Sequence, residues 1–95
     1  MRYYISGPMT GMPDYNRAAF YEAERKLLAA GHSAYNPARY ADEHPGKTYE
    51  EYMEADLGAL ENCDRLLMLE GWQQSMGARR EYDKALMMGL SVVEE

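Results

Sequence analysis

Hydrophobic and polar positions alternate between strand-like and helix-like segments along the whole chain. Four short apolar or β-branched runs, at residues 2–6, 33–36, 64–69 and 90–93, predict strands. Between them, apolar residues recur at intervals of three or four, which predicts three helices. The expected order is therefore strand, helix, strand, helix, strand, helix, strand, in one domain over residues 1–95.

The helix starts and stops have recognisable signals. Asp14 or Asn16 is expected to cap the first helix, whose apolar face is Phe20, Ala23, Leu27 and Ala30, and Gly31 to end it. Thr48 is expected to cap the second helix, with Glu51 completing a capping box. The apolar spacing of that helix comes from Tyr49, Tyr52, Met53, Leu57 and Leu60. The polar residues 38–47 between these helices are interpreted as a mobile loop, with a lid as one alternative.

The run Leu66–Leu69 is continuously apolar, which is typical of a strand in a parallel sheet with helices on both faces. The fold class predicted is α/β: a small flavodoxin-like or Rossmann-like three-layer sandwich with an open parallel sheet of about four strands in the order 2-1-3-4. Ligands bind such sheets beyond the strand C-termini, at the point where successive connections leave in opposite directions. The Gly- and Pro-rich loop 7–13 and the loop 71–75 are both expected there.

Glu81 has an unusual position in the third helix, for which Ser75 is the predicted cap. Ala78, Tyr82, Ala85 and Gly89 share one helix face, and Glu81 lies about 60° from Ala78 and about 40° from Ala85. This position favours a carboxylate at the border of the buried face. The structural alternative is an exposed Glu81 that pairs with Arg79, Arg80 or Lys84.

Charge and composition narrow the function classes. A net charge of −6 argues against a nucleic-acid polymer or an anionic membrane as partner, although a single nucleotide remains compatible. The single cysteine, Cys63, cannot form an intramolecular disulfide, and we expect a cytoplasmic protein. No run approaches the roughly 18 apolar residues of a membrane span. His32 and His44 are isolated, so no metal site is predicted.

Four motifs occur in a characteristic sequence order. They are Tyr4-Ile-Ser-Gly-Pro8, Asp56-Leu-x-x-Leu60, Asp64 followed by apolar residues, and Ser75-x-Gly-Ala-x-x-Glu81-x-x-x-Ala85. Together they resemble the nucleoside 2-deoxyribosyltransferase family and the related 2′-deoxynucleoside 5′-monophosphate N-glycosidases. The chain is most similar to short phage and bacterial proteins of that superfamily whose function is uncharacterised.

The resemblance implies a role for each matching residue. Glu81 matches the nucleophile that attacks the anomeric carbon of the sugar, Tyr4 the tyrosine that positions it, and Asp56 the residue that holds a sugar hydroxyl. Ser75 matches a phosphate-contacting serine. The implied substrate-binding set is Ser6, Gly7, Pro8, Met9, Gly11, Trp72, Ser75 and Gly77. Neither a metal nor an organic cofactor is implied.

Two positions depart from the pattern of the superfamily. Thr10 lies nearest to the position of a basic residue in the monophosphate hydrolases, and the loop Gly71-Trp-Gln-Gln74 lacks an acid that helps to protonate the base. We therefore carry two hypotheses. The first is cleavage or exchange of the N-glycosidic bond of a (deoxy)nucleoside or nucleoside monophosphate. The second is a non-catalytic nucleotide-binding or protein-interaction module, and a flavin carrier is a weaker third.

Each site residue also has a structural interpretation. Tyr4 is also compatible with simple packing in the sheet, Asp56 with a solvated helix position, and Ser75 with capping alone. Trp72 is suited to stack on a base or to anchor an oligomer contact. Aromatic side chains are abundant for a sheet this small, and we expect a homo-oligomer, a dimer or larger.

Overall fold

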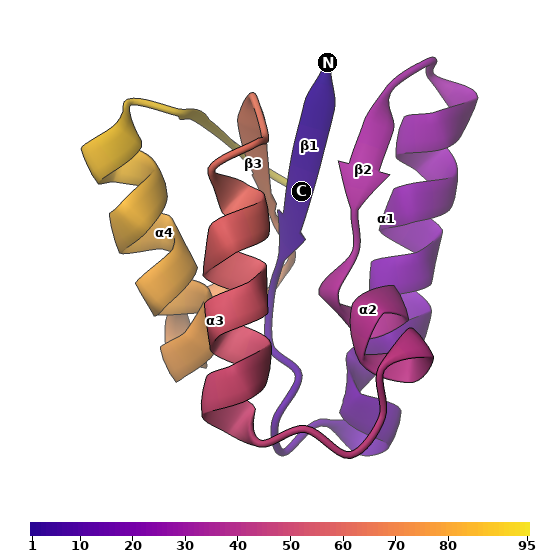
Figure 1. The fold of residues 1–95 in the computed structure, drawn as a ribbon. Helices are drawn as coiled ribbons and strands as arrows, with labels where there is room; N and C mark the ends of the chain where they lie inside the picture. Colours follow the sequence, from indigo (N-terminus) through magenta and orange to yellow (C-terminus); the bar gives the residue numbers. More distant parts are fainter.

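The computed structural model describes residues 1–95 as an α/β sandwich around one parallel sheet (Figure 1). The strands are β1 (Arg2–Ser6), β2 (Ser33–Tyr35), β3 (Arg65–Met68) and β4 (Ser91–Glu94), and all adjacent pairs are parallel. Their order is β2-β1-β3-β4. The predicted fold class and the 2-1-3-4 order are confirmed.

The main helices are α1 (Arg17–Ala29), α3 (Tyr49–Leu60) and α4 (Met76–Met88). Alternate residues of β1 face opposite layers. Tyr4 packs into a cluster with side chains of α3 and α4, whereas Ile5 packs into a second cluster with α1. None of the helices combines the length and the apolarity that a membrane span requires.

Three predicted helix ends are confirmed. The Thr48 hydroxyl accepts from the Glu51 amide at 3.1 Å, and the Glu51 carboxylate accepts from the Thr48 amide at 2.8 Å. The Ser75 hydroxyl accepts from the Ala78 amide at 3.2 Å. Gly31, at φ +89°, follows the C-cap of α1, and the His32 amide donates back to the Leu27 carbonyl at 3.0 Å. This is a Schellman ending.

The segment 38–47 was wrongly interpreted as a loop. Residues Pro37–Glu43 form helix α2, because Asn36 caps it by accepting from the Ala38 amide at 2.9 Å and Pro37 starts the first turn. An Asn-Pro pair is thus a helix start here, although its Asn36 was included in the strand predicted over residues 33–36. Only the connection after α2 remains irregular.

The start of α1 also differs from the prediction. Residues Pro13–Asn16 form a short 3₁₀ element, η1, in which Asp14, Tyr15 and Asn16 have positive φ angles of 50°, 53° and 60°. Asn16 occupies the N-cap position, but its side chain donates to the Pro8 carbonyl at 3.0 Å instead of capping the helix. The side chain therefore ties the helix start to the loop after β1.

Burial along β3 alternates, which corrects the expectation of burial on both faces. Leu66 and Met68 are fully buried toward α3 and α4, whereas Arg65 and Leu67 are only half-buried. The reason is that α1, with Ala38 of α2 beside it, covers the other face mainly over β1 and β2. The half of that face formed by β3 and β4 has no helix over it.

Candidate active site

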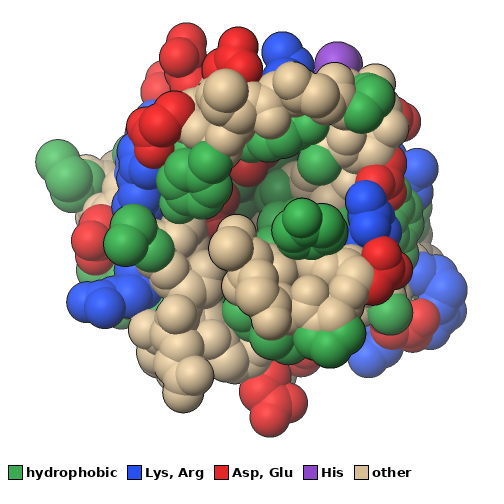
Figure 2. All heavy atoms as spheres, turned by 90° about the horizontal axis from the view of Figure 1, so that it is seen from below, with side chains coloured by type: hydrophobic (Ala, Val, Ile, Leu, Met, Phe, Trp, Pro, Cys, Tyr) green, Lys and Arg blue, Asp and Glu red, His purple; other side chains and the backbone are tan.

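A hollow of about 830 Å³ opens at the C-terminal ends of the strands. Figure 2 looks into it, with hydrophobic side chains around its mouth and acidic side chains inside. Its walls come from the loop after β1, from α1, α2 and α3, and from the start of α4. Six of the predicted catalytic or substrate-binding residues line it: Gly7, Met9, Asp56, Ser75, Gly77 and Glu81.

Glu81 is the best-anchored polar group of this hollow. The residue is only 5% exposed, and both of its carboxyl oxygens accept hydrogen bonds. The Tyr4 hydroxyl donates to Oε2 at 2.5 Å and the Ser6 hydroxyl donates to Oε1 at 2.6 Å. Tyr4 and Ser6 are two residues apart in β1, so their side chains point to the same face of the sheet. The strand therefore offers two hydroxyls to one carboxyl group.

The exposed-flank alternative for Glu81 is wrong. Ala78, Glu81 and Ala85 form the buried face of α4, as the border position predicted. The neighbouring cations pair elsewhere, since Arg80 binds Glu50 at 2.9 Å and Lys84 binds Glu61 at 2.7 Å. Glu81 is consequently held by neutral hydroxyl groups alone.

Burial shifts the acidity of Glu81. Desolvation raises the pKa of its carboxyl group to about 8, against the lowering effect of the hydrogen bonds from Ser6 and Tyr4, and the charge of Asp56 raises it further. Burial also raises the pKa of Asp56, to about 6, and the hydrogen bond from Tyr35 opposes this. Because the two groups interact, they titrate as a pair that holds one proton between about pH 6 and 8.

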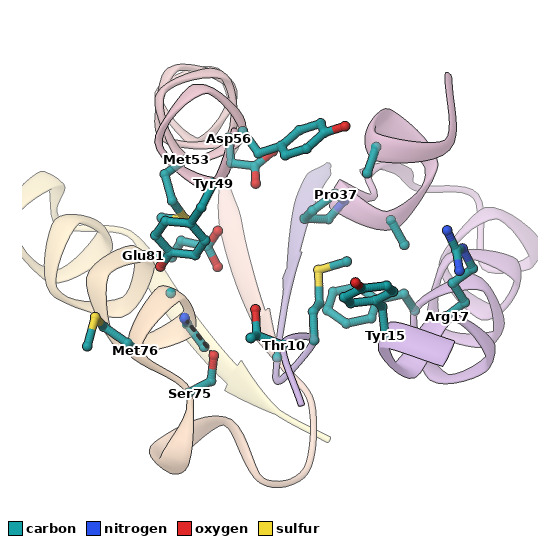
Figure 3. Close-up of a pocket in the computed structure, with 18 of the residues that line it drawn as sticks. Thr10, Tyr15, Arg17, Pro37, Tyr49, Met53, Asp56, Ser75, Met76 and Glu81 are labelled. Atoms are coloured by element: carbon teal, nitrogen blue, oxygen red, sulfur yellow. Dashed lines mark hydrogen bonds between the residues drawn. The ribbon is translucent and has the colours of Figure 1, made fainter. Parts of the chain in front are cut away.

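Asp56 lies on α3 and points into the same space as Glu81 (Figure 3). It is 7% exposed, so the interpretation as a solvated helix residue is wrong. The Tyr35 hydroxyl donates to Asp56 Oδ1 at 2.8 Å, and the Tyr35 ring stacks on the Tyr4 ring with centroids 5.2 Å apart.

Tyr35 was missed by the sequence analysis. It ends β2, and the parallel register sets it directly beside Tyr4. The sequence contained a signal for it. Tyr4 and Tyr35 lie near the C-terminal ends of two strands, and the 2-1-3-4 order makes these strands neighbours, so both residues belong to the same edge of the sheet. Their side chains then extend toward the same helices.

The start of α4 forms a second, uncharged part of the wall. Ser75 lines the hollow and also caps the helix, so capping and ligand contact are compatible in one residue. A Cβ atom at Gly77 would lie 3.2 Å from the Tyr49 hydroxyl oxygen, so this glycine lets α3 approach α4 closely. Thr10 and Gln74 add neutral polar groups.

Basic residues are scarce in this wall. Arg17 and Lys47 line the hollow, and in Figure 3 Arg17 lies on the side opposite Glu81. Arg17 is also engaged by Asp14 at 2.7 Å and Asp42 at 2.8 Å. The lining residues at the start of α4, Gln74 to Ala78, carry no charge.

Four predicted substrate-binding residues do not reach the hollow. Ser6 is fully buried behind Glu81, which it positions. Pro8 and Gly11 line a separate depression of about 510 Å³ between the loops after β1 and β3. The Trp72 ring packs against the Tyr82 ring, with centroids 4.6 Å apart and planes tilted by 33°, and its indole N–H donates to Glu94 at 3.2 Å. The structure therefore places the Trp72 ring against α4 and β4, outside the hollow in which base stacking was expected.

No group of three or more His, Cys, Asp or Glu side chains converges to form a metal site. No curated protein matches the sequence significantly. A family model, described as a domain of unknown function (DUF4406), matches residues 1–94, which is nearly the whole chain. The chain therefore belongs to the DUF4406 family.

Proposed function

We propose that this protein cleaves or exchanges the N-glycosidic bond of a (deoxy)nucleoside or nucleoside monophosphate, with Glu81 as the nucleophile. One observation carries the proposal: a buried carboxyl group at the wall of the hollow, whose two oxygens are each held by a hydroxyl of β1, faces the same space as a second carboxyl group. Nucleophilic displacement at a sugar carbon uses such a fixed carboxylate together with a second group that exchanges protons.

The first step joins Glu81 to the sugar. A Glu81 oxygen attacks the anomeric carbon, the carbon–nitrogen bond breaks, and its electron pair leaves with the base, which takes up a proton. Asp56 is the other carboxyl group in the wall, so it is the candidate donor of that proton as well as the expected partner of a sugar hydroxyl.

The second step releases the sugar. Water attacks the same carbon from the side that the base has left and gives a proton to Asp56, while the ester bond breaks and Glu81 recovers its carboxylate. A second base in place of water gives the exchange reaction. The apolar wall residues Met9, Phe20 and Met53 suit a flat base.

The test is release of free base from a panel of deoxynucleosides and their 5′-monophosphates, followed by chromatography. Glu81→Gln and Glu81→Ala should abolish release. Asp83→Asn is the matched control, because Asp83 is an exposed carboxylate on the same helix. The proposal fails if Glu81→Gln releases base at the wild-type rate. Mass spectrometry of quenched reactions should find the sugar ester on the peptide that contains Glu81.

The alternative function is nucleotide binding without chemistry. Two features favour it: Thr10 lies nearest to the position of a basic residue in the monophosphate hydrolases, and the loop at residues 71–74 carries no acid. Titration calorimetry with the same panel distinguishes the two functions, since saturable binding without any base release selects the binding module.

We also propose a cytoplasmic homo-oligomer. The free, buried Cys63 suits a reducing compartment. Large apolar side chains remain exposed on α4, with Met76 at 75% and Met87 at 89% exposure, and association would cover them. Sedimentation analysis tests the assembly, and a monomer at high concentration would refute it.

A further inference from the structure

Asp56 depends on one neighbour within the protein. The Tyr35 hydroxyl donates to its Oδ1 atom at 2.8 Å, and this is the sole hydrogen bond that the carboxyl group makes. No Lys or Arg forms an ion pair with it. The other oxygen, Oδ2, makes no hydrogen bond within the protein, and the residue lines the hollow.

The Tyr35 ring is itself fixed on two sides. It stacks on Tyr4 from β1, with centroids 5.2 Å apart and planes 21° apart. From α2, the Tyr40 ring is tilted against it, with centroids 6.2 Å apart. Tyr40 in turn stacks on His44, with centroids 4.2 Å apart. With the ring held between β1 and α2, the hydroxyl is directed at Asp56.

We propose that Tyr35 is a positioning residue, whose hydroxyl orients Asp56 so that Oδ2 meets the substrate. The catalytic consequence of this inference rests on the proposed function. The coupling between Tyr35 and Asp56 is independent of that function. The titratable groups around Asp56 are Tyr35 from β2, Tyr4 from β1 and Glu81 from α4, with Tyr40 of α2 behind Tyr35. All of them are neutral or acidic, so the phenol of Tyr35 is the group that stabilises a negative charge on Asp56.

A single pair of variants tests the inference. Tyr35→Phe keeps the ring stack and removes the hydroxyl. Tyr40→Phe is the matched control, because Tyr40 is the next ring in the same stack and its hydroxyl makes no hydrogen bond to Asp56. NMR titration of the Asp56 side-chain carboxyl carbon, in the free protein, reads the coupling without any substrate.

We expect Tyr35→Phe to raise the pKa of Asp56 by about one unit, since a hydrogen bond to a charged group is worth roughly 1.5–3 kcal/mol. The acid limb of the base-release profile should move upward with it, and kcat at neutral pH should fall about tenfold. Tyr40→Phe should change neither. An unchanged Asp56 titration in folded Tyr35→Phe protein overturns the inference.

The outcomes separate the two proposals. If wild-type protein releases no base, the proposed function fails, and the NMR titration alone decides whether Tyr35 controls Asp56. If the enzyme is active and the Asp56 titration moves while the pH profile does not, the positioning role in catalysis is refuted. The NMR spectrum of each variant also reports whether it is folded.

Discussion

Tyr4 and Glu81 are 77 positions apart in the chain, and the Tyr4 hydroxyl donates a 2.5 Å hydrogen bond to Glu81 Oε2. The pairing joins the first strand to the last helix at the centre of the molecule. Both residues are buried, and Ser6 holds the other oxygen of the same carboxyl group. The orientation of Glu81 is therefore set by β1 and not by its own helix.

Removing the Tyr4 hydroxyl should weaken the proposed nucleophile. In Tyr4→Phe the ring still packs, but Glu81 loses a donor that lowers its pKa, so its pKa should rise above about 8. We expect base release at pH 7 to fall by about 10- to 100-fold. The alkaline limb of the pH profile should move upward with that pKa. Tyr21→Phe, which removes an exposed hydroxyl, is the control, and equal rates for both variants would contradict the role of Tyr4.

The pH dependence of kcat/KM should be bell-shaped with its maximum near pH 7. Between about pH 6 and 8 the pair holds one proton, and the reactive form carries that proton on Asp56. Below about pH 6 both carboxyl groups are protonated and no carboxylate remains to attack the sugar. Above about pH 8 both are ionised and no proton is available for the leaving base. Steady-state rates between pH 5 and 10 check this. A profile that keeps rising above pH 9 would exclude a proton-donating carboxyl group.

Stability should fall as the pH rises, and Glu81 should be a principal cause. Burial raises the folded-state pKa of Glu81 from its ordinary 4.5 to about 8, so folded protein binds this proton more tightly than unfolded protein does. The contribution is complete below about pH 4.5 and is lost progressively up to about pH 8.

Glu81→Gln carries no such proton. In urea unfolding, the free energy of unfolding of Glu81→Gln relative to that of the wild type should increase by a few kcal/mol between pH 5 and pH 9. Asp83→Asn, on the exposed side of α4, should run parallel to the wild type. If the stability of Glu81→Gln showed the same pH dependence as that of the wild type, ionisation of the buried carboxyl group would not destabilise the fold.

Gly7→Ala should destabilise the protein through packing. A Cβ atom at Gly7 would lie 2.8 Å from the Leu69 Cβ atom, at the point where β1 and β3 end side by side. Overpacking of this kind costs about 1–3 kcal/mol, measurable as a lower Tm. Gly58→Ala is the matched control, because nothing lies near that helical position, and it should stabilise by roughly 0.5–1 kcal/mol. The steric explanation fails if Gly7→Ala melts with the wild type.

Thr48→Ala should cost about 1 kcal/mol, because it removes the cap of α3. Glu51→Ala should also destabilise, since it removes the reciprocal bond. The double variant should cost less than the sum of the two, because each bond orients the other group. Strict additivity in urea unfolding would contradict a coupled capping box.

Local signals in the sequence determined most of the fold. The capping box at Thr48 and Glu51, the Gly31 stop and the Ser75 cap all act within a few residues, so they can be recognised along the chain. The incorrect predictions concern residues whose local pattern is compatible with two different structures. Asn36-Pro37 ends a strand and starts α2 at once, and Asn16 turned its side chain to the Pro8 carbonyl.

The sequence by itself determined that Glu81 borders the buried face of α4, since helical periodicity fixes that angle. Only the tertiary structure decided what the carboxyl group meets. Ser6, which was expected to contact substrate, donates a hydrogen bond to Glu81, and the Tyr35 hydroxyl donates to Asp56. The Trp72 indole donates to Glu94 and lies outside the hollow. These outcomes depend on strand register and on contacts between elements distant in sequence, because periodicity fixes the face of a residue but not its neighbour across the sheet.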